Sequence, residues 1–129
     1  MSDSTETAIL DHTCLAALYR ADEFFTGLYI EASHQRGRIL IPSLCVWAAD
    51  RATPGTARHA ASLRHAEHVA FTTAHAVEAS AWAGTEAAVA HAAAIAWQAA
   101  TAGDSYTVLS LSPELYRSTA VRPLNPYED

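Results

Sequence analysis

The residue with the clearest chemical potential is Asp11, which follows the short apolar run Ala8–Leu10 and precedes a helix-forming stretch. An acid at the carboxyl end of a buried parallel strand occupies the place where open α/β sheets bind ligands and carry out chemistry. With a second carboxylate it would form an oxygen site for Mg²⁺ or Mn²⁺, ions that activate water for hydrolysis. Asp11 is therefore the first candidate catalytic and metal-binding residue. Its alternative role is structural and needs no metal: its carboxylate would accept hydrogen bonds from the helix that starts at Thr13.

Asp11 is the only carboxylate at the expected strand ends. The other polar residues at these ends carry hydroxyl or imidazole groups: His12, Thr13, Ser43, Thr72, Thr73, Ser110 and Ser112. Of these, His12, Thr13 and Ser112 are predicted to line a binding cleft together with Asp11. We also expect Thr13 and Ser43 to cap the helices that follow the first and second strands.

Apolar runs and helical periodicity alternate along the chain. The strands are expected at residues 8–10, 38–42, 68–73 and 106–111, with a short edge strand at 120–124 that ends at Pro123. The helices are expected at residues 13–21, 23–35, 44–52, 57–66, 74–83 and 85–101, with a single turn at 112–117. This alternation predicts an α/β protein with three layers, α/β/α, around a parallel sheet of four to five strands. No linker divides it, so residues 1–129 form one domain with an ordered core at about 7–124.

Composition narrows the function classes. The chain has 14 acidic residues, eight arginines and no lysine, giving a net charge of −6, which does not favour RNA or DNA as a partner. Cys14 and Cys45 lie in apolar contexts and are expected to be buried, reduced thiols. The N-terminus lacks the pattern of a signal peptide, and the apolar run at 87–100 is too short to span a membrane. A cytoplasmic protein without membrane contact is the expectation.

Several familiar sites are excluded by missing residues. None of the five glycines forms a phosphate-binding loop between a strand and a helix. A phosphorylated receiver site would need a lysine, and a phosphoaspartyl phosphatase would need an aspartate in place of Thr13. The Gly-x-Ser-x-Gly turn of serine hydrolases is also absent.

Three segments resemble the PIN domain, the small α/β fold of VapC-type bacterial toxin ribonucleases. "AILDHTCLAAL" resembles its opening strand and helix, "RGRILIPSLCVWAA" its second strand and helix, and "TEAAVAHAAAIAWQAATAGDSYTVLSLSPELYR" its closing half. The resemblance covers residues 7–124. It implies a PIN-like fold, a cluster of three or four acids that binds Mg²⁺ or Mn²⁺, RNA as substrate, a homodimer and a small antitoxin-like protein partner.

Only the first acid of that cluster is present. Asp11 matches the first position, whereas the second falls at Ala48, the third near Val89 and the fourth near Ser112. Asp50 lies two residues after Ala48 and is turned about 200° around the helix. Glu86 lies three residues before Val89, on the same helix face, and could supply a second metal-binding carboxylate. Its alternative role is that of a solvated acid favoured by the helix dipole.

Two hypotheses also exist for the role of His91. It is either a metal ligand or general base beside Asp11, or a histidine hydrogen-bonded to neighbouring backbone or to Asp11. Four of the five other histidines, His59, His65, His68 and His75, share no metal-binding face and are expected at the surface. Most of the large aromatic side chains are expected in the core, and the rest would form an apolar patch for a partner: Phe24, Phe25, Tyr29, Trp47, Trp82 and Trp97.

The sequence thus predicts a degenerate PIN-like domain that lacks nuclease activity and acts by binding a protein or a small ligand. No cofactor is expected in that case. The alternative is a metal-dependent ribonuclease with a rearranged site, built from Asp11 and Glu86 with His91 or Asp50 and loaded with Mg²⁺ or Mn²⁺. An apolar cleft floor at Ala48 and Val89 would favour binding, and convergence of Glu86 and His91 on Asp11 would favour the enzyme.

Overall fold

The computed structural model describes residues 6–128 and contains a parallel sheet of four strands. The strands are β1 (Thr7–Leu10), β2 (Arg38–Pro42), β3 (Glu67–Val69) and β4 (Tyr106–Leu109), in the spatial order β3-β2-β1-β4. In register, Ile9 of β1 pairs with Leu40 on one side and Val108 on the other. The predicted α/β class and parallel sheet are confirmed.

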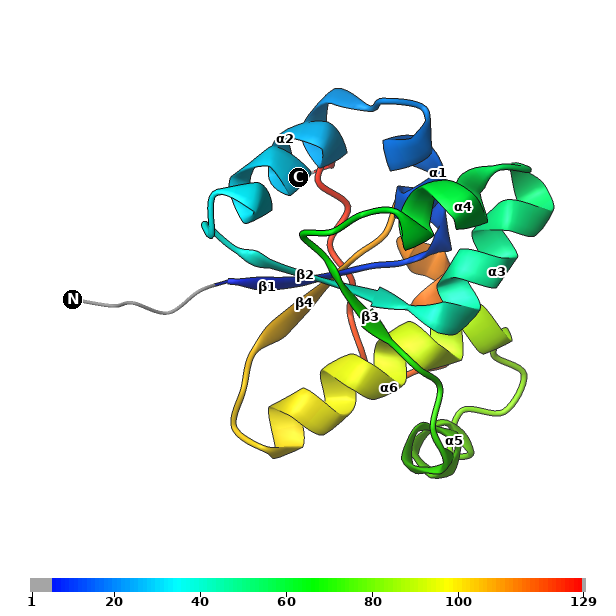
Figure 1. Ribbon diagram of the computed structural model, residues 1–129. Coiled ribbons are helices and arrows are strands. Elements are labelled where there is room, and N and C mark those ends of the chain that lie inside the picture. Colours follow the sequence, from blue (N-terminus) through cyan, green and yellow to red (C-terminus); the bar gives the residue numbers. More distant parts are fainter. Residues whose placement is uncertain (1–5, 129) are drawn as a thin grey trace.

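Helices cover both faces of the sheet, as the alternating pattern predicted. They are α1 (His12–Tyr19), α2 (Glu23–Ser33), α3 (Ser43–Ala52), α4 (Thr56–Ala61), α5 (Thr73–Ala79) and α6 (Ala87–Thr101), with a 3₁₀ turn, η1, at Pro113–Tyr116. Figure 1 shows α1 and α2 above the sheet and α6 below it, with α5 outside α6. The described residues include no helix that is long and apolar enough to cross a membrane.

The core lies between the central strands and these helices. Its largest enclosed apolar side chains include Ile9, Leu10, Leu15, Phe25 and Ile41. Helix α6 is buried along most of its length because its alanines allow close packing against the sheet and against α3. Cys14 and Cys45 are buried and free, as predicted.

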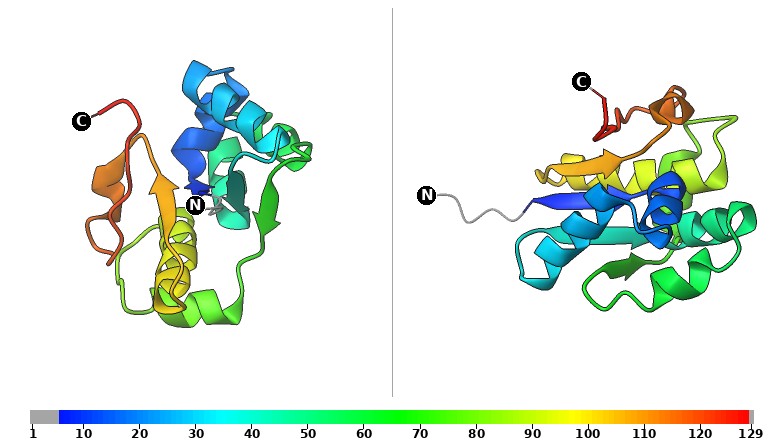
Figure 2. Two further views of the ribbon diagram at one scale, coloured as in Figure 1. Left: turned by 90° about the vertical axis from the view of Figure 1, so that its left-hand side faces the viewer. Right: turned by 90° about the horizontal axis from the view of Figure 1, so that it is seen from above.

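Several predicted details are wrong. Strand β3 has three residues rather than six, because Thr72 leaves the sheet to cap α5. Helix α4 ends at Ala61 rather than residue 66, and α6 begins at Ala87 rather than residue 85. The expected edge strand at 120–124 is reduced to a single bridge between Leu109 and Leu124, beside β4 in Figure 2. The residue that pairs with β4 is Leu124, directly after Pro123, because the proline itself has no N–H to donate to a neighbouring strand.

The predicted helix caps are also wrong. Asp11, not Thr13, caps α1, although the expected structural role of the Asp11 carboxylate as an acceptor for this helix is confirmed. Pro42 is the N-cap residue of α3 and makes no side-chain hydrogen bond, while the Ser43 hydroxyl donates to the carbonyl of Val69, tying α3 to β3.

The aromatic side chains are less buried than predicted. Phe25 and Trp82 lie in the core and Tyr29 is half-buried, but Phe24, Trp47 and Trp97 are exposed. His75, expected at the surface, is buried. Exposed aromatic groups therefore exist on α2, α3 and α6, and the position of Trp47 bears on the candidate site.

Candidate functional site

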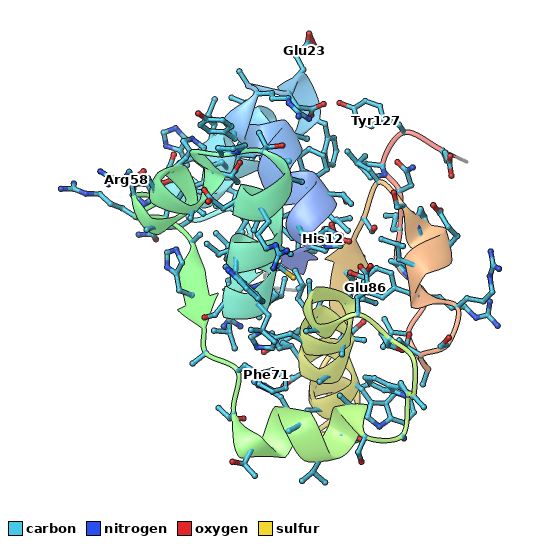
Figure 3. All side chains as sticks on the ribbon, turned by 90° about the vertical axis from the view of Figure 1, so that its right-hand side faces the viewer. His12, Glu23, Arg58, Phe71, Glu86 and Tyr127 are labelled. Carbon is cyan, nitrogen blue, oxygen red and sulfur yellow. The ribbon has the colours of Figure 1, made fainter. Side chains whose placement is uncertain are left out.

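The topology directs attention to the carboxyl end of β1. From β1 the chain moves to β2 on one side, and later crosses to β4 on the other, so the strand order reverses beside β1. Ligands of open α/β sheets bind at such a point. Figure 3 looks onto this end of the molecule, where His12 and Glu86 are labelled near the centre and Phe71 lies toward α5.

Asp11 occupies the expected place but is completely enclosed. Its Oδ1 accepts hydrogen bonds from the Thr13 N–H at 2.9 Å, the Thr13 hydroxyl at 2.5 Å and the Cys14 N–H at 3.2 Å. Its Oδ2 accepts from the Tyr116 hydroxyl at 2.8 Å. Both carboxylate oxygens therefore serve as a cap for α1 and as an acceptor for η1. A cation could reach them only by displacing these donors.

Tyr116 is the buried partner of Asp11 at the carboxyl end of β1. It belongs to the 3₁₀ turn after β4, and its side chain is 2% exposed. Burial and the nearby Asp11 carboxylate raise the pKa of the Tyr116 hydroxyl, so this group stays protonated and donates. Sequence reasoning missed this role, because nothing in "SPELYR" indicates that its tyrosine turns inward toward β1.

The two thiols beside this cluster are hydrogen-bonded to backbone carbonyls. The Cys14 Sγ donates to Leu109 O at 3.1 Å and the Cys45 Sγ to Ala88 O at 3.2 Å. Burial, followed by the charge of Asp11, raises the pKa of both thiols. Because a thiol reacts as its thiolate, these cysteines are inert structural groups.

His91 is placed in a different cluster. Its Nδ1 accepts a hydrogen bond from the Leu44 N–H at 3.3 Å, and its ring lies 4.9 Å from that of His75 and 5.0 Å from that of Phe71, centroid to centroid. Burial and the neighbouring His75 lower its pKa to about 4. The contacts are with α3 and α5, and match the backbone-bonded reading rather than a base beside Asp11.

These two histidines are also poor metal ligands. The Nδ1 of His75 accepts from the Thr72 N–H at 3.1 Å, as the Nδ1 of His91 does from Leu44. Each proton is therefore on Nε2, where a metal would otherwise bind. Within residues 6–128, no group of three or more His, Cys, Asp or Glu side chains could hold a metal ion.

The other predicted cleft residues are dispersed. Thr13 is bonded to Asp11 and accepts from the Leu111 N–H, and His12 is half-buried beside it, with a buried Nδ1 that has no partner within residues 6–128. Asp50 accepts from the Gly55 and Ala57 N–H groups, which fixes the turn between α3 and α4.

Two further predicted cleft residues lie in the protein interior or a turn. Val89 is buried in the core, and the Ser112 N–H donates to the Ser110 hydroxyl. Of the expected apolar floor, only Ala48 lines an open pocket.

That pocket lies between α3 and the start of α6 and has a volume of about 490 Å³. Its lining combines four alanines, two larger apolar side chains and two charged ones, and consists of Leu44, Trp47, Ala48, Arg51, Ala52, Glu86, Ala87 and Ala88. Ala88 is also the residue whose carbonyl accepts the hydrogen bond from Cys45, a thiol whose pKa the charge of Asp11 helps to raise. The pocket therefore adjoins the closed strand end.

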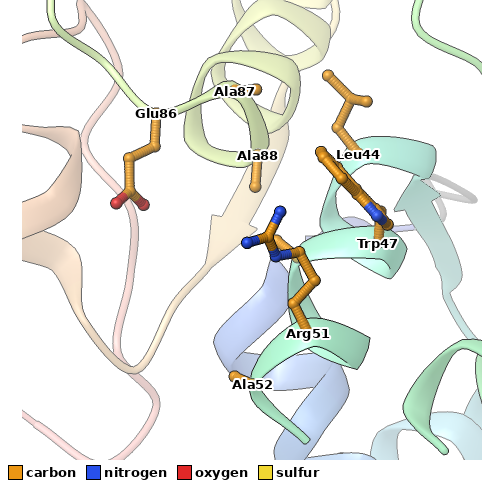
Figure 4. A pocket seen from close by; sticks show the side chains of 8 residues that line it. Leu44, Trp47, Arg51, Ala52, Glu86, Ala87 and Ala88 are labelled. Atoms are coloured by element: carbon orange, nitrogen blue, oxygen red, sulfur yellow. The ribbon is translucent and has the colours of Figure 1, made fainter. Parts of the chain in front are cut away.

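Three side chains give this pocket its chemistry. Trp47 is 58% exposed, and the Arg51 guanidinium lies 5.2 Å from the centroid of its ring. Glu86 is the N-cap residue of α6 and is exposed, without a side-chain cap hydrogen bond. Figure 4 shows Arg51 extending between Trp47 and Glu86. Sequence reasoning missed Trp47 and Arg51 as site residues, although their spacing of four on a helix indicates that they share a face.

Comparison of the sequence with models of protein families and with curated proteins gives no match. The functional argument therefore rests on the geometry of the pocket and on the closure of the site around Asp11.

Proposed function

We propose that this chain is a degenerate PIN-like domain that acts by binding, with the pocket between α3 and α6 as its ligand site. The observation that carries the proposal is the contrast between the enclosed carboxylate of Asp11 and the open pocket next to it. Asp11 is sealed beneath η1 with both oxygens occupied, while the adjoining open pocket is lined by alanines, Trp47 and Arg51. Such a lining favours burial of an apolar group over activation of water.

The size and composition of the pocket support a small organic ligand. Pockets for such ligands usually have volumes of about 300–1,000 Å³ and combine apolar walls with a few polar groups. Here the apolar surface comes from alanines and from Trp47, and the polar groups are Arg51 and Glu86. An exposed indole next to a cavity gives a large contact area with little loss of side-chain freedom.

The ribonuclease alternative would require a change of structure. Asp11 would have to lose the Tyr116 hydroxyl and reach a metal shared with Glu86, which lies on another element and faces solvent. A hard cation needs several oxygen ligands to displace its water. No observation within residues 6–128 favours this arrangement, so we take binding as the function.

A cytoplasmic location, expected from the sequence, belongs to the same proposal, as do the homodimer and the antitoxin-like protein partner that the resemblance implies. Exposed large side chains on three helices are compatible with such contacts: Ile30 on α2, Trp47 on α3 and Val77 on α5. These contacts are secondary to the pocket in this proposal.

Ligand-induced changes in the backbone amide NMR spectrum test the proposed function. A set of small aromatic fragments, added singly to the full chain, should shift the amide signals of residues 47–52 and 86–88. Trp47→Ala should abolish these shifts, and Trp97→Ala should retain them, since Trp97 is equally an exposed tryptophan but lies outside the pocket. Shifts confined to other surfaces, or none with any fragment, would contradict the proposal.

A further inference from the structure

We propose that the pocket binds a small zwitterion with an aromatic or apolar body, of the amino-acid class. The inference rests on the proposed function and adds the ligand's chemistry. It follows from three features of the pocket: a cation on one wall, an anion on the other, and an apolar floor between them.

Arg51 is the group that would hold the carboxylate of the ligand. Within residues 6–128 its guanidinium takes part in no ion pair or hydrogen bond, so its N–H donors are available. The face of Trp47, at 5.2 Å from the guanidinium carbon, holds this group in place and displaces water from one side of it. A guanidinium positioned in this way binds a carboxylate through two parallel hydrogen bonds.

Glu86 is the group that would hold the ammonium of the ligand. It precedes the first turn of α6, and its carboxylate has no hydrogen-bond or ion-pair partner in the described part of the chain. Among the described residues, Arg51 and Glu86 do not form an ion pair with each other, and in Figure 4 both side chains line the pocket, Arg51 from α3 and Glu86 from the start of α6. Each charge is therefore available to a ligand.

This pair of charges selects against ligands with one charge only. A simple anion attracted by Arg51 would meet the carboxylate of Glu86, and a simple cation attracted by Glu86 would meet the guanidinium. A zwitterion satisfies both charges and leaves neither one buried without a partner. The overall charge of −6 adds a further penalty for anionic ligands such as phosphates.

The floor of the pocket fits the body of the ligand. Ala48, Ala52, Ala87 and Ala88 have small side chains, and Leu44 and Trp47 form an apolar wall. Contact with the exposed indole ring favours an aromatic side chain over an aliphatic one, since offset or edge contacts between rings add to the burial of apolar area. L-Phenylalanine is the simplest molecule that carries all three features.

The test compares three related molecules by isothermal titration calorimetry on the full chain. L-Phenylalanine has both charges, 3-phenylpropionate lacks the ammonium, and 2-phenylethylamine lacks the carboxylate. We expect L-phenylalanine to bind about tenfold more tightly than either analogue. In Arg51→Gln, L-phenylalanine should bind no more tightly than 2-phenylethylamine. In Glu86→Gln, it should bind no more tightly than 3-phenylpropionate. Arg58→Gln, at an arginine on α4 outside the pocket, should leave the binding series unchanged.

Two results would overturn the inference. The wild type would fail to bind L-phenylalanine, or it would bind one of the analogues as tightly as L-phenylalanine. In either case, amide shifts at residues 47–52 and 86–88 with one of the analogues would keep the proposed binding function. If none of the fragments, analogues or L-phenylalanine moved those signals, the proposed function would fail together with the inference. The variants change exposed side chains, so unchanged thermal unfolding midpoints verify that they are folded.

Discussion

The role assigned to Asp11 predicts a large loss of stability when its carboxylate is removed. In Asp11→Ala the helix α1 loses its N-cap, and the Tyr116 hydroxyl loses its acceptor in a buried site. The Thr13 hydroxyl also loses its acceptor. A residue kept only for catalysis would behave differently, since its removal would leave the free energy of unfolding unchanged or raise it.

The magnitude follows from these contacts. Loss of an N-cap costs about 1 kcal/mol. An unpaired buried hydroxyl costs about 1–3 kcal/mol, and Tyr116 is 2% exposed. We therefore expect Asp11→Ala to lower the free energy of unfolding by about 3–4 kcal/mol. For a domain of this size that corresponds to a fall of roughly 10–20 °C in the unfolding midpoint.

Urea denaturation followed by circular dichroism and tryptophan fluorescence measures this change. Asp22→Ala is the matched control, because Asp22 likewise caps a helix, α2, through the Phe25 N–H and accepts from a tyrosine hydroxyl, that of Tyr127, but is only half-buried. It should cost about 1 kcal/mol. A loss in Asp11→Ala no greater than that of the control would refute the assignment of Asp11 to a buried network.

Three further substitutions test other parts of the account. Tyr116→Phe, which removes the donor to Asp11, should lower the free energy of unfolding by about 1–2 kcal/mol in urea denaturation; an unchanged value would show that this hydrogen bond contributes nothing. His91 has a pKa of about 4 in the folded protein, below the ordinary 6.5, so the unfolded state binds the proton more readily. The free energy of unfolding should therefore fall by about 2–3 kcal/mol as the pH drops from 7 to 4.5. His91→Gln should flatten this dependence and exposed His34→Gln should not; equal pH profiles in all three proteins would contradict the assignment. Gly55→Ala should lower the unfolding midpoint, because Gly55 has φ of +103° and an added Cβ would meet the Tyr19 hydroxyl, whereas Gly27→Ala, in open space on α2, should raise it by the better helix propensity of alanine. Midpoint shifts of the same sign would count against this difference.

The sheet and its layers were predictable because their signals are local. The runs before Asp11, around Ile39–Ile41 and before Ser110 are short, apolar and separated by helical stretches. Only a parallel sheet with helices on both faces buries such runs. The position of Asp11 at a strand end followed from the same pattern.

The contacts of Asp11 with the start of α1 were predictable because they are local, but its contact with Tyr116 was not, because it joins residues distant in sequence. Tyr116 lies 105 residues from Asp11 along the chain. In the same way, Ser43 bonds to Val69 across 26 residues instead of capping its own helix. Local propensity describes the nearest available partner, whereas tertiary packing decides which partner is used.

In the candidate site, too, some residues were predictable from local sequence and others only from tertiary packing. Glu86 and Ala48 were identified from the positions of the missing acids, and both line the pocket. Trp47 was one of six aromatic residues of which most were expected in the core and the rest in an apolar patch, because large aromatic side chains are usually buried. It is exposed because α3 packs on α1, α4 and α6 through its other faces. Its chemical importance therefore became visible only with the packing of the helices.

The most direct test of a binding role is the cleavage of a mixed RNA pool with Mg²⁺ or Mn²⁺ by the wild type and by Glu86→Gln. The substitution is at an exposed residue and leaves the Asp11 network intact. Our account predicts that the wild type cleaves no more RNA with metal than with a chelator, and that the variant behaves identically. Metal-dependent cleavage by the wild type that disappears in Glu86→Gln would contradict it, and would place a working nuclease site at the carboxyl end of β1.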